Sequence, residues 1–100
     1  MYETNAKSSG GKSLGAIRAD PAMLALGALG WILSDADRAD RMLNLTGLTP
    51  DILRGGVSEN ATLAAILSFL EAHEPDLVAA AEHIGAKPEA LVRARQELEA

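Results

Sequence analysis

The strongest constraint on the fold is an ungapped internal similarity at an offset of 38 residues, which aligns residues 24–54 with residues 62–92. An aromatic residue within a helix, a glycine after the next helix and a proline at the start of a third recur in the same order. These matched pairs are Trp31 with Phe69, Gly47 with Gly85, and Pro50 with Pro88. The similarity predicts two pseudo-repeated three-helix units, at about residues 24–54 and 62–92.

The composition favours an all-α fold. Hydrophobic residues make up 48% of the 100 residues, yet only 3% are aromatic, so the core must come mainly from aliphatic helix faces. A chain of this length suffices for one small domain. The sequence has no cysteine, which excludes disulfides, thiolate metal sites and cysteine nucleophiles. This absence is typical of a reducing compartment, and we expect a cytoplasmic protein.

The net charge of −5 is unevenly distributed along the chain. The first 18 residues carry a net +2, so the remaining 82 carry −7. An acidic body disfavours nonspecific contact with nucleic acid or anionic lipid. The uncharged stretch 21–34 is shorter than the roughly 20 residues that a membrane span needs, and the opening residues lack a cationic end followed by an apolar run. We therefore expect no membrane association and no export.

Helix starts are marked by proline, since each of the four prolines follows a residue in a capping position. These pairs are Asp20-Pro21, Thr49-Pro50, Glu74-Pro75 and Lys87-Pro88. Together with starts near Asp35 and Ser58, they predict a compact six-helix bundle. The expected helices are roughly residues 21–34, 36–45, 50–55, 59–73, 75–84 and 88–99. Residues 19–100 form the single helical domain, whereas residues 1–18, which have little to bury, are expected to be a flexible N-terminal tail.

The first predicted helix is apolar on every face, which indicates a central position in the bundle. It contains Gly27 and Gly30, although glycine within a helix is less favourable than alanine by about 1 kcal/mol. We expect close approach of another helix backbone at both glycines. The alternative is a gap that holds a ligand.

Three motifs resemble those of a known family. They are Trp31-Ile-Leu-Ser-Asp35, Thr46-Gly-Leu-Thr-Pro50 and the Phe69-Leu70 pair. In this arrangement the chain resembles, over about residues 20–98, the family of short bacterial proteins known as domain of unknown function DUF3572. Ile32 stands where that family usually has leucine, and His73 where it usually has an acidic residue. The resemblance implies a small helical fold and no particular activity, cofactor or substrate.

No residue pattern indicates catalysis, a cofactor or a metal. Residues 9–13 end like a phosphate-binding loop, but that motif requires a glycine where this chain has Ala6. His73 and His83 have no histidine or cysteine partner at metal-ligand spacing. The acidic cluster 35–40 is accounted for by the favourable position of negative charge at a helix N-terminus. We therefore expect a protein that is not an enzyme and that binds no cofactor or metal.

Residues 78–98 suggest one specific function, because a helix, a glycine turn and a second helix follow one another at helix-turn-helix spacing. In a DNA-binding protein of that class, Lys87, Arg93 and Arg95 would contact phosphates or bases. The acidic residues Glu89, Glu97 and Glu99 on the same helix cancel those charges. Nucleic-acid binding is thus the alternative hypothesis.

The leading hypothesis is a non-catalytic helical interaction module that binds a protein partner or a second copy of itself. The candidate contact surface consists of Leu45, Leu48 and Leu53, which lie near the expected turn of the first unit. The alternative is that these three leucines simply complete the core.

Overall fold

The computed structural model describes residues 20–56 and 59–100, and these residues form six α-helices and no strand. The all-α six-helix prediction is thus confirmed. The helices are α2 (Pro21–Leu33), α3 (Ala36–Thr46), α4 (Pro50–Gly56), α5 (Asn60–Glu71), α6 (Glu74–Ile84) and α7 (Pro88–Glu99). The expected tail, residues 1–18, and the phosphate-loop-like residues 9–13 lie outside the described residues.

Side-chain caps fix three of the helix starts. The Asp20 carboxylate accepts a hydrogen bond from the amide of Ala22 at 3.0 Å at the start of α2. Asp35 accepts one from the amide of Arg38 at 3.1 Å at the start of α3. Thr49 does the same for α4 by accepting from the amide of Ile52 at 3.1 Å. By contrast, α6 and α7 begin without a side-chain cap, and α6 starts at Glu74, one residue before the predicted position.

Two glycines end α3 and α6 in the same way. Gly47 has φ of 78° and Gly85 has φ of 75°, the left-handed conformation that glycine adopts without steric penalty. The amide of Gly47 donates to the carbonyl oxygen of Leu43 at 3.1 Å, and that of Ala86 donates to Ala81 at 2.9 Å. One carbonyl in the last turn of each helix, that of Leu43 or Ala81, is thereby satisfied by the residues that follow.

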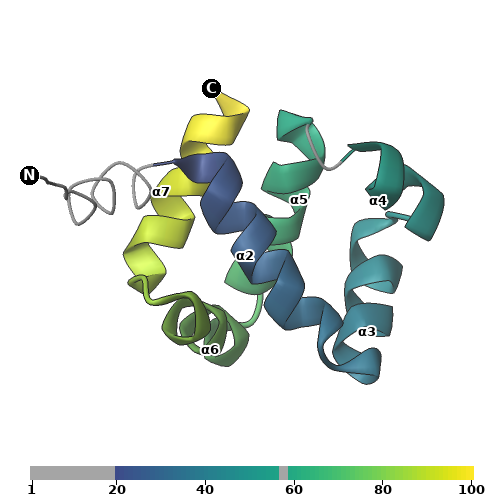
Figure 1. Cartoon of the computed structure of the whole chain (residues 1–100), viewed down its shortest axis with the longest axis horizontal. Coiled ribbons are helices and arrows are strands. Elements are labelled where there is room, and N and C mark those ends of the chain that lie inside the picture. The colour runs from purple at the N-terminus through teal and green to yellow at the C-terminus, as the bar shows by residue number, and fades with distance from the viewer. Residues whose placement is uncertain (1–19, 57–58) are drawn as a thin grey trace, which may run out of the picture.

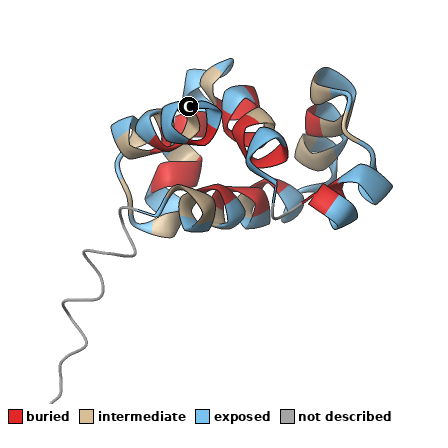
Figure 2. Ribbon diagram, turned by 90° about the horizontal axis from the view of Figure 1, so that it is seen from above, coloured by how far each residue is buried: buried red, intermediate tan, exposed pale blue. Residues whose placement is uncertain are grey.

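Helix α2 is central, and it contacts α3, α5, α6 and α7. In Figure 1 it crosses in front of α5 and α7, while α3 and α4 form the end of the molecule away from α7. The most extensive helix packing is between α5 and α7. Figure 2 shows the buried positions on the inward faces of the helices. The fully buried large side chains are Ile32, Met42, Leu63, Ile66, Leu67, Leu70 and Leu91.

The two glycines of α2 have different surroundings. A side chain at Gly27 would bring its Cβ to 3.0 Å from Cγ2 of Ile84, so close packing is present there, although against a side chain rather than a helix backbone. At Gly30 no heavy atom lies within 4 Å of the corresponding position. The expected close approach at Gly30 is therefore wrong for the isolated chain, because no described helix packs on that face of α2.

The order of the helices matches the predicted repeat, since α2, α3 and α4 align with α5, α6 and α7. The two aromatic residues differ in burial, because Trp31 is half-buried and Phe69 is buried. An origin of the fold in two equivalent units stays a prediction.

Candidate functional site

The three leucines proposed as a contact surface lie in different environments. Leu45 is 70% exposed, Leu48 packs partly against the core, and Leu53 is buried. Leu53 and Leu45 also face two different hollows, described below. The structure therefore does not bring the three side chains together as one exposed patch.

The first hollow, which we call the α2–α4 groove, lies between α2, α3 and α4. Its volume is about 320 Å³, and its lining is apolar except for one arginine. The lining residues are Leu29, Leu33, Leu43, Pro50, Leu53 and Arg54. Its leucines differ in exposure, since Leu29 and Leu53 are buried whereas Leu33 is exposed. Arg54 is exposed and forms an ion pair with Asp51 one turn earlier.

The second hollow lies between α3 and α5 and has a volume of about 350 Å³. Its lining residues are Leu45, Thr46, Ala65, Ser68, Phe69 and Ala72. The Thr46 hydroxyl donates to the carbonyl of Met42 at 2.6 Å and accepts from the amide of Leu48 at 3.2 Å. This side chain is thus already engaged in the turn after α3, and the hollow is less apolar than the α2–α4 groove.

Sequence reasoning missed an exposed apolar row on α2. Met23 is 51% exposed, Leu26 40% and Leu33 48%, and the exposed Gly30 lies in the same row. Because α2 is apolar on every face, its periodicity could not show which side is exposed. The available signal was Gly30, a glycine within a helix beside which the described residues place no heavy atom within 4 Å.

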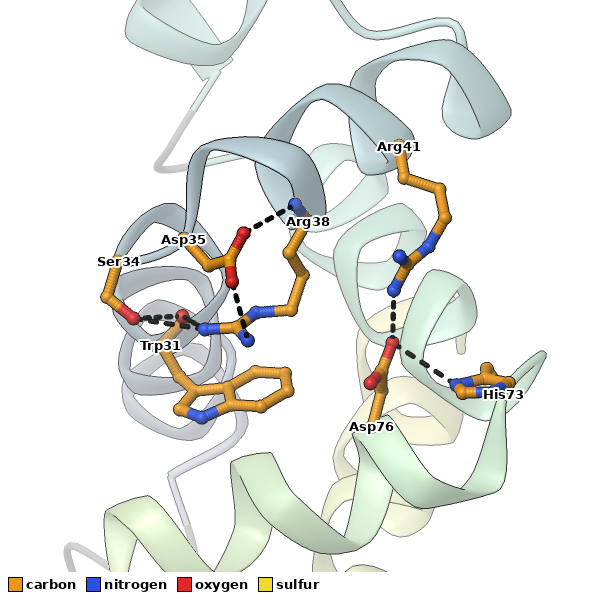
Figure 3. Close-up of polar contacts among 7 residues, drawn as sticks. All are labelled: Trp31, Ser34, Asp35, Arg38, Arg41, His73 and Asp76. Carbon is orange, nitrogen blue, oxygen red and sulfur yellow. Dashed lines mark hydrogen bonds and ion pairs between the residues drawn. The ribbon is translucent and has the colours of Figure 1, made fainter.

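The corner between α2 and α3 is held by Arg38, whose contacts are shown in Figure 3. Its guanidinium carbon lies 3.6 Å from the centre of the Trp31 ring, a cation–π contact. Its Nη2 atom donates to the carbonyl of Trp31 at 2.6 Å and to the hydroxyl of Ser34 at 3.0 Å. The arginine thus closes the C-terminal end of α2, where cations are favoured.

Asp35 completes this corner as the N-cap of α3. The hydrogen bond from the amide of Arg38, followed by the positive charge of the Arg38 side chain, lowers the pKa of Asp35 below its ordinary value. The carboxylate is therefore charged at neutral pH and serves the local structure. Asp35 thus caps α3, and the acidic cluster 35–40 lies at the N-terminal end of this helix, where negative charge is favoured.

A second polar cluster links α3 to α6. Arg41 donates to Oδ2 of Asp76 at 2.6 Å, and Nδ1 of His73 lies 3.3 Å from the same oxygen, as Figure 3 shows. His83 lies elsewhere, at the C-terminal end of α6. Within residues 20–56 and 59–100, no three histidine, cysteine or acidic side chains are grouped as a metal site would require.

The three candidate nucleic-acid contacts are not equally available, because two are exposed and one is paired with acidic residues. Lys87 and Arg93 are exposed, but Arg95 forms ion pairs with Glu71 of α5 and, at 2.6 Å, with Glu99. The hydrogen bond with Glu71 raises the pKa of Arg95 above its ordinary value. Arg95 thus fastens α7 to α5, and it is not available to a phosphate without breaking those pairs.

These observations define the class of the protein as a small all-α bundle with an apolar groove at one end. The chain belongs to the family described as Protein of unknown function (DUF3572), whose model matches residues 18–100. The resemblance inferred from the three motifs is thereby confirmed. Comparison with curated proteins and with solved structures gives no match. Over the part of the chain that the structure describes, no helix is long and apolar enough to cross a membrane.

Proposed function

We propose that this protein is a non-catalytic interaction module that binds an apolar protein segment in the α2–α4 groove. The observation that carries the proposal is the lining of the groove, in which five of six residues are apolar and two of these, Leu33 and Pro50, are exposed. Apolar clefts that accept the hydrophobic face of a helix are a common mode of peptide recognition. Leu53, one of the three leucines of the predicted surface, forms part of the groove wall.

The surroundings of the groove also support binding. Leu33 extends the apolar surface onto α2, and Ile52 of α4 is 50% exposed beside the lining residue Leu53. Exposed apolar surface of this kind marks interaction sites in small proteins. Arg54 is the one charged residue in the lining, so the groove offers no pair of groups for acid–base chemistry. The absence of cysteine from the sequence favours a reducing, cytoplasmic location.

The test compares two substitutions at residues of similar exposure on different helices. Leu33→Lys places a charge in the groove, whereas Val78→Lys places the same charge on α6, where Val78 is 43% exposed. Each tagged variant and the original chain are used to capture proteins from a lysate of the source cells, with quantitative mass spectrometry. Proteins lost with Leu33→Lys and retained with Val78→Lys are the expected result. Capture of the same proteins at the same levels by all three forms contradicts the proposal.

DNA binding by residues 78–98 is the second candidate, and the glycine turn between α6 and α7 is the observation that favours it. The pairing of Arg95 with two carboxylates weakens it. The test is a mobility-shift assay on random duplex DNA at about 50 mM salt, because phosphate contacts are strongest at low salt. If Arg93 contacts phosphate, Arg93→Gln weakens the shift, and absence of any shift by the original chain removes this candidate.

A further inference from the structure

The exposed face of α2 carries a regular row of residues, which we call the α2 stripe: Met23, Leu26, Gly30 and Leu33. Their spacing of three, four and three residues is that of the a and d positions of a heptad. Such spacing is typical of a seam along which two helices pack. Within the described residues α2 already uses its opposite faces against α5, α6 and α7, so the stripe is a second packing face.

The glycine at position 30 is consistent with close approach of another backbone to this face of α2. Glycine within a helix is unfavourable relative to alanine, and the usual compensation is close contact with another backbone. At Gly27 the Ile84 side chain fills the space beside the glycine, but at Gly30 the described residues place no heavy atom within 4 Å. The described part of the folded chain therefore does not explain why position 30 lacks a side chain.

The stripe is self-complementary. If a second α2 lies antiparallel to the first, with the two-fold axis beside position 28, Leu26 of each copy meets Gly30 of the other. In the same register Met23 meets Leu33 at both ends of the seam. A large side chain is thus opposite the glycine, and the flexible methionine is opposite leucine. We propose that a second copy of this chain docks antiparallel on the α2 stripe to form a two-fold symmetric dimer.

Charge favours this face over the others for self-association. The chain has a net charge of −5, so two copies repel one another wherever acidic surfaces meet. Helix α2 is the one helix of the described residues with no charged side chain, whereas α3 to α7 all carry acidic residues. A contact along α2 therefore brings two uncharged helices together.

The dimer also gives the α2–α4 groove an occupant. Leu33 belongs both to the stripe and to the groove lining, so Met23 of the second copy would lie over Leu33 at the mouth of the groove. The inference therefore rests on the proposed function, in that it names a second copy of the chain as the partner.

Sedimentation velocity of the full chain tests the dimer at concentrations from about 10 μM to about 1 mM, the range for a small interface. Gly30→Gln restores a helix-favouring residue but blocks close approach, and it should raise the dimer dissociation constant at least about tenfold. Gly55→Gln is the matched control, because Gly55 is also a helical, exposed glycine with no atom within 4 Å. Circular dichroism melts must show that both variants stay folded. A monomeric original chain at all concentrations, or equal dissociation constants for all three forms, overturns the proposal.

Disulfide cross-linking tests the orientation, since the natural chain has no cysteine. Residues 23 and 33 are about 15 Å apart along a helix, whereas a disulfide requires Cα atoms within about 7 Å. Under mild oxidation, a mixture of Met23→Cys and Leu33→Cys chains should form the mixed dimer, and neither variant alone should cross-link. Cross-linking of each variant with itself and not with the other shows a parallel seam and overturns the arrangement.

These outcomes are separable from failure of the groove proposal. If the chain is monomeric but Leu33→Lys still loses captured proteins that Val78→Lys retains, the groove binds another protein and only the dimer is refuted. If the dimer forms and neither lysine variant changes capture or association, the groove proposal and the placement of Leu33 in the dimer seam both fail.

Discussion

Helices α3 and α4 and helices α6 and α7 follow the same local plan but contribute differently to the fold. In each pair a left-handed glycine, Gly47 or Gly85, ends the first helix, and a proline three residues later begins the second. Local sequence therefore specifies the same helix–turn–helix connection twice. The difference between the pairs must come from what each one packs against.

Burial separates the two pairs. The second pair buries residues on both helices against α2 and α5, namely Leu77, Ala80, Ala81, Leu91, Ala94 and Leu98. The first pair buries Met42 on α3 and Leu53 and Gly56 on α4, and α4 has few neighbours apart from α5. Figure 1 shows α3 and α4 at one end of the molecule, where the α2–α4 groove opens. The same turn thus joins two core helices in one place and borders an open groove in the other.

The largest expected difference is in the loss of unfolding free energy when a leucine is shortened in the second helix of each pair. Leu91 of α7 is fully buried, whereas Leu53 of α4 is 9% exposed and borders the open groove. Leu91→Ala should lower the unfolding free energy by about 3 to 5 kcal/mol because it leaves a closed cavity. Leu53→Ala should lower it by no more than about 2 kcal/mol, since no closed cavity results. Urea unfolding followed by circular dichroism measures both, and equal losses would show that the two pairs are equally part of the core.

An intermediate effect is expected at the two glycine turns. Gly47→Ala and Gly85→Ala each place a Cβ at positive φ, which should lower the unfolding free energy by about 1 to 2 kcal/mol. No heavy atom lies within 4 Å of either added Cβ, so the penalty is one of backbone conformation alone. The two losses should therefore agree, and Asn variants should lose less because asparagine tolerates this conformation. Strongly different melting temperatures of the two alanine variants would show that the two turns do not contribute equally to stability.

The sequence was sufficient for most helix ends because those ends depend on neighbouring residues. Pro21, Pro50 and Pro88 each begin a helix as predicted, and Gly47 and Gly85 adopt the conformation that makes glycine necessary. The family was also predicted from short motifs that the family comparison bears out. These features require no knowledge of distant parts of the chain.

The candidate site could not be predicted in the same way, because exposure depends on how the helices assemble. Leu45 and Leu53 each lie two residues before a glycine, yet Leu45 is 70% exposed and Leu53 is part of the buried core. Likewise Gly27 and Gly30 lie on one helix, but only Gly27 has a neighbour, which comes from α6. The internal similarity aligns α3 and α4 with α6 and α7, so it does not predict the α2–α4 groove that the first pair borders.

The smallest expected difference between the two pairs is in how their stability responds to low pH. Helix α3 has an aspartate cap, Asp35, whereas α6 begins at a His73 cap position with no side-chain hydrogen bond. Because the pKa of Asp35 is lowered in the folded protein, its stabilisation is present above the ordinary pKa of 3.8 and is lost as the pH falls through the lower folded value.

Asp35→Asn keeps the capping geometry and removes this titration. The unfolding free energy of the original chain should therefore fall more than that of the variant between about pH 5 and pH 2. Denaturant titrations at a series of pH values measure the difference. Parallel pH profiles would show that the cap of α3 does not respond to acid.

The stacking of Arg38 of α3 on Trp31 of α2 allows optical spectroscopy to follow the junction between these two helices. Trp31 is the single tryptophan of the chain, and its ring is covered by a side chain from α3, so detachment of α3 changes the surroundings of the indole. Far-ultraviolet circular dichroism, in contrast, sums over every helix. Superimposable denaturation curves from indole emission and from ellipticity would mean that the groove end and the main bundle unfold as one cooperative unit. An earlier emission change would mean that the end of the molecule with the α2–α4 groove opens while the rest stays intact.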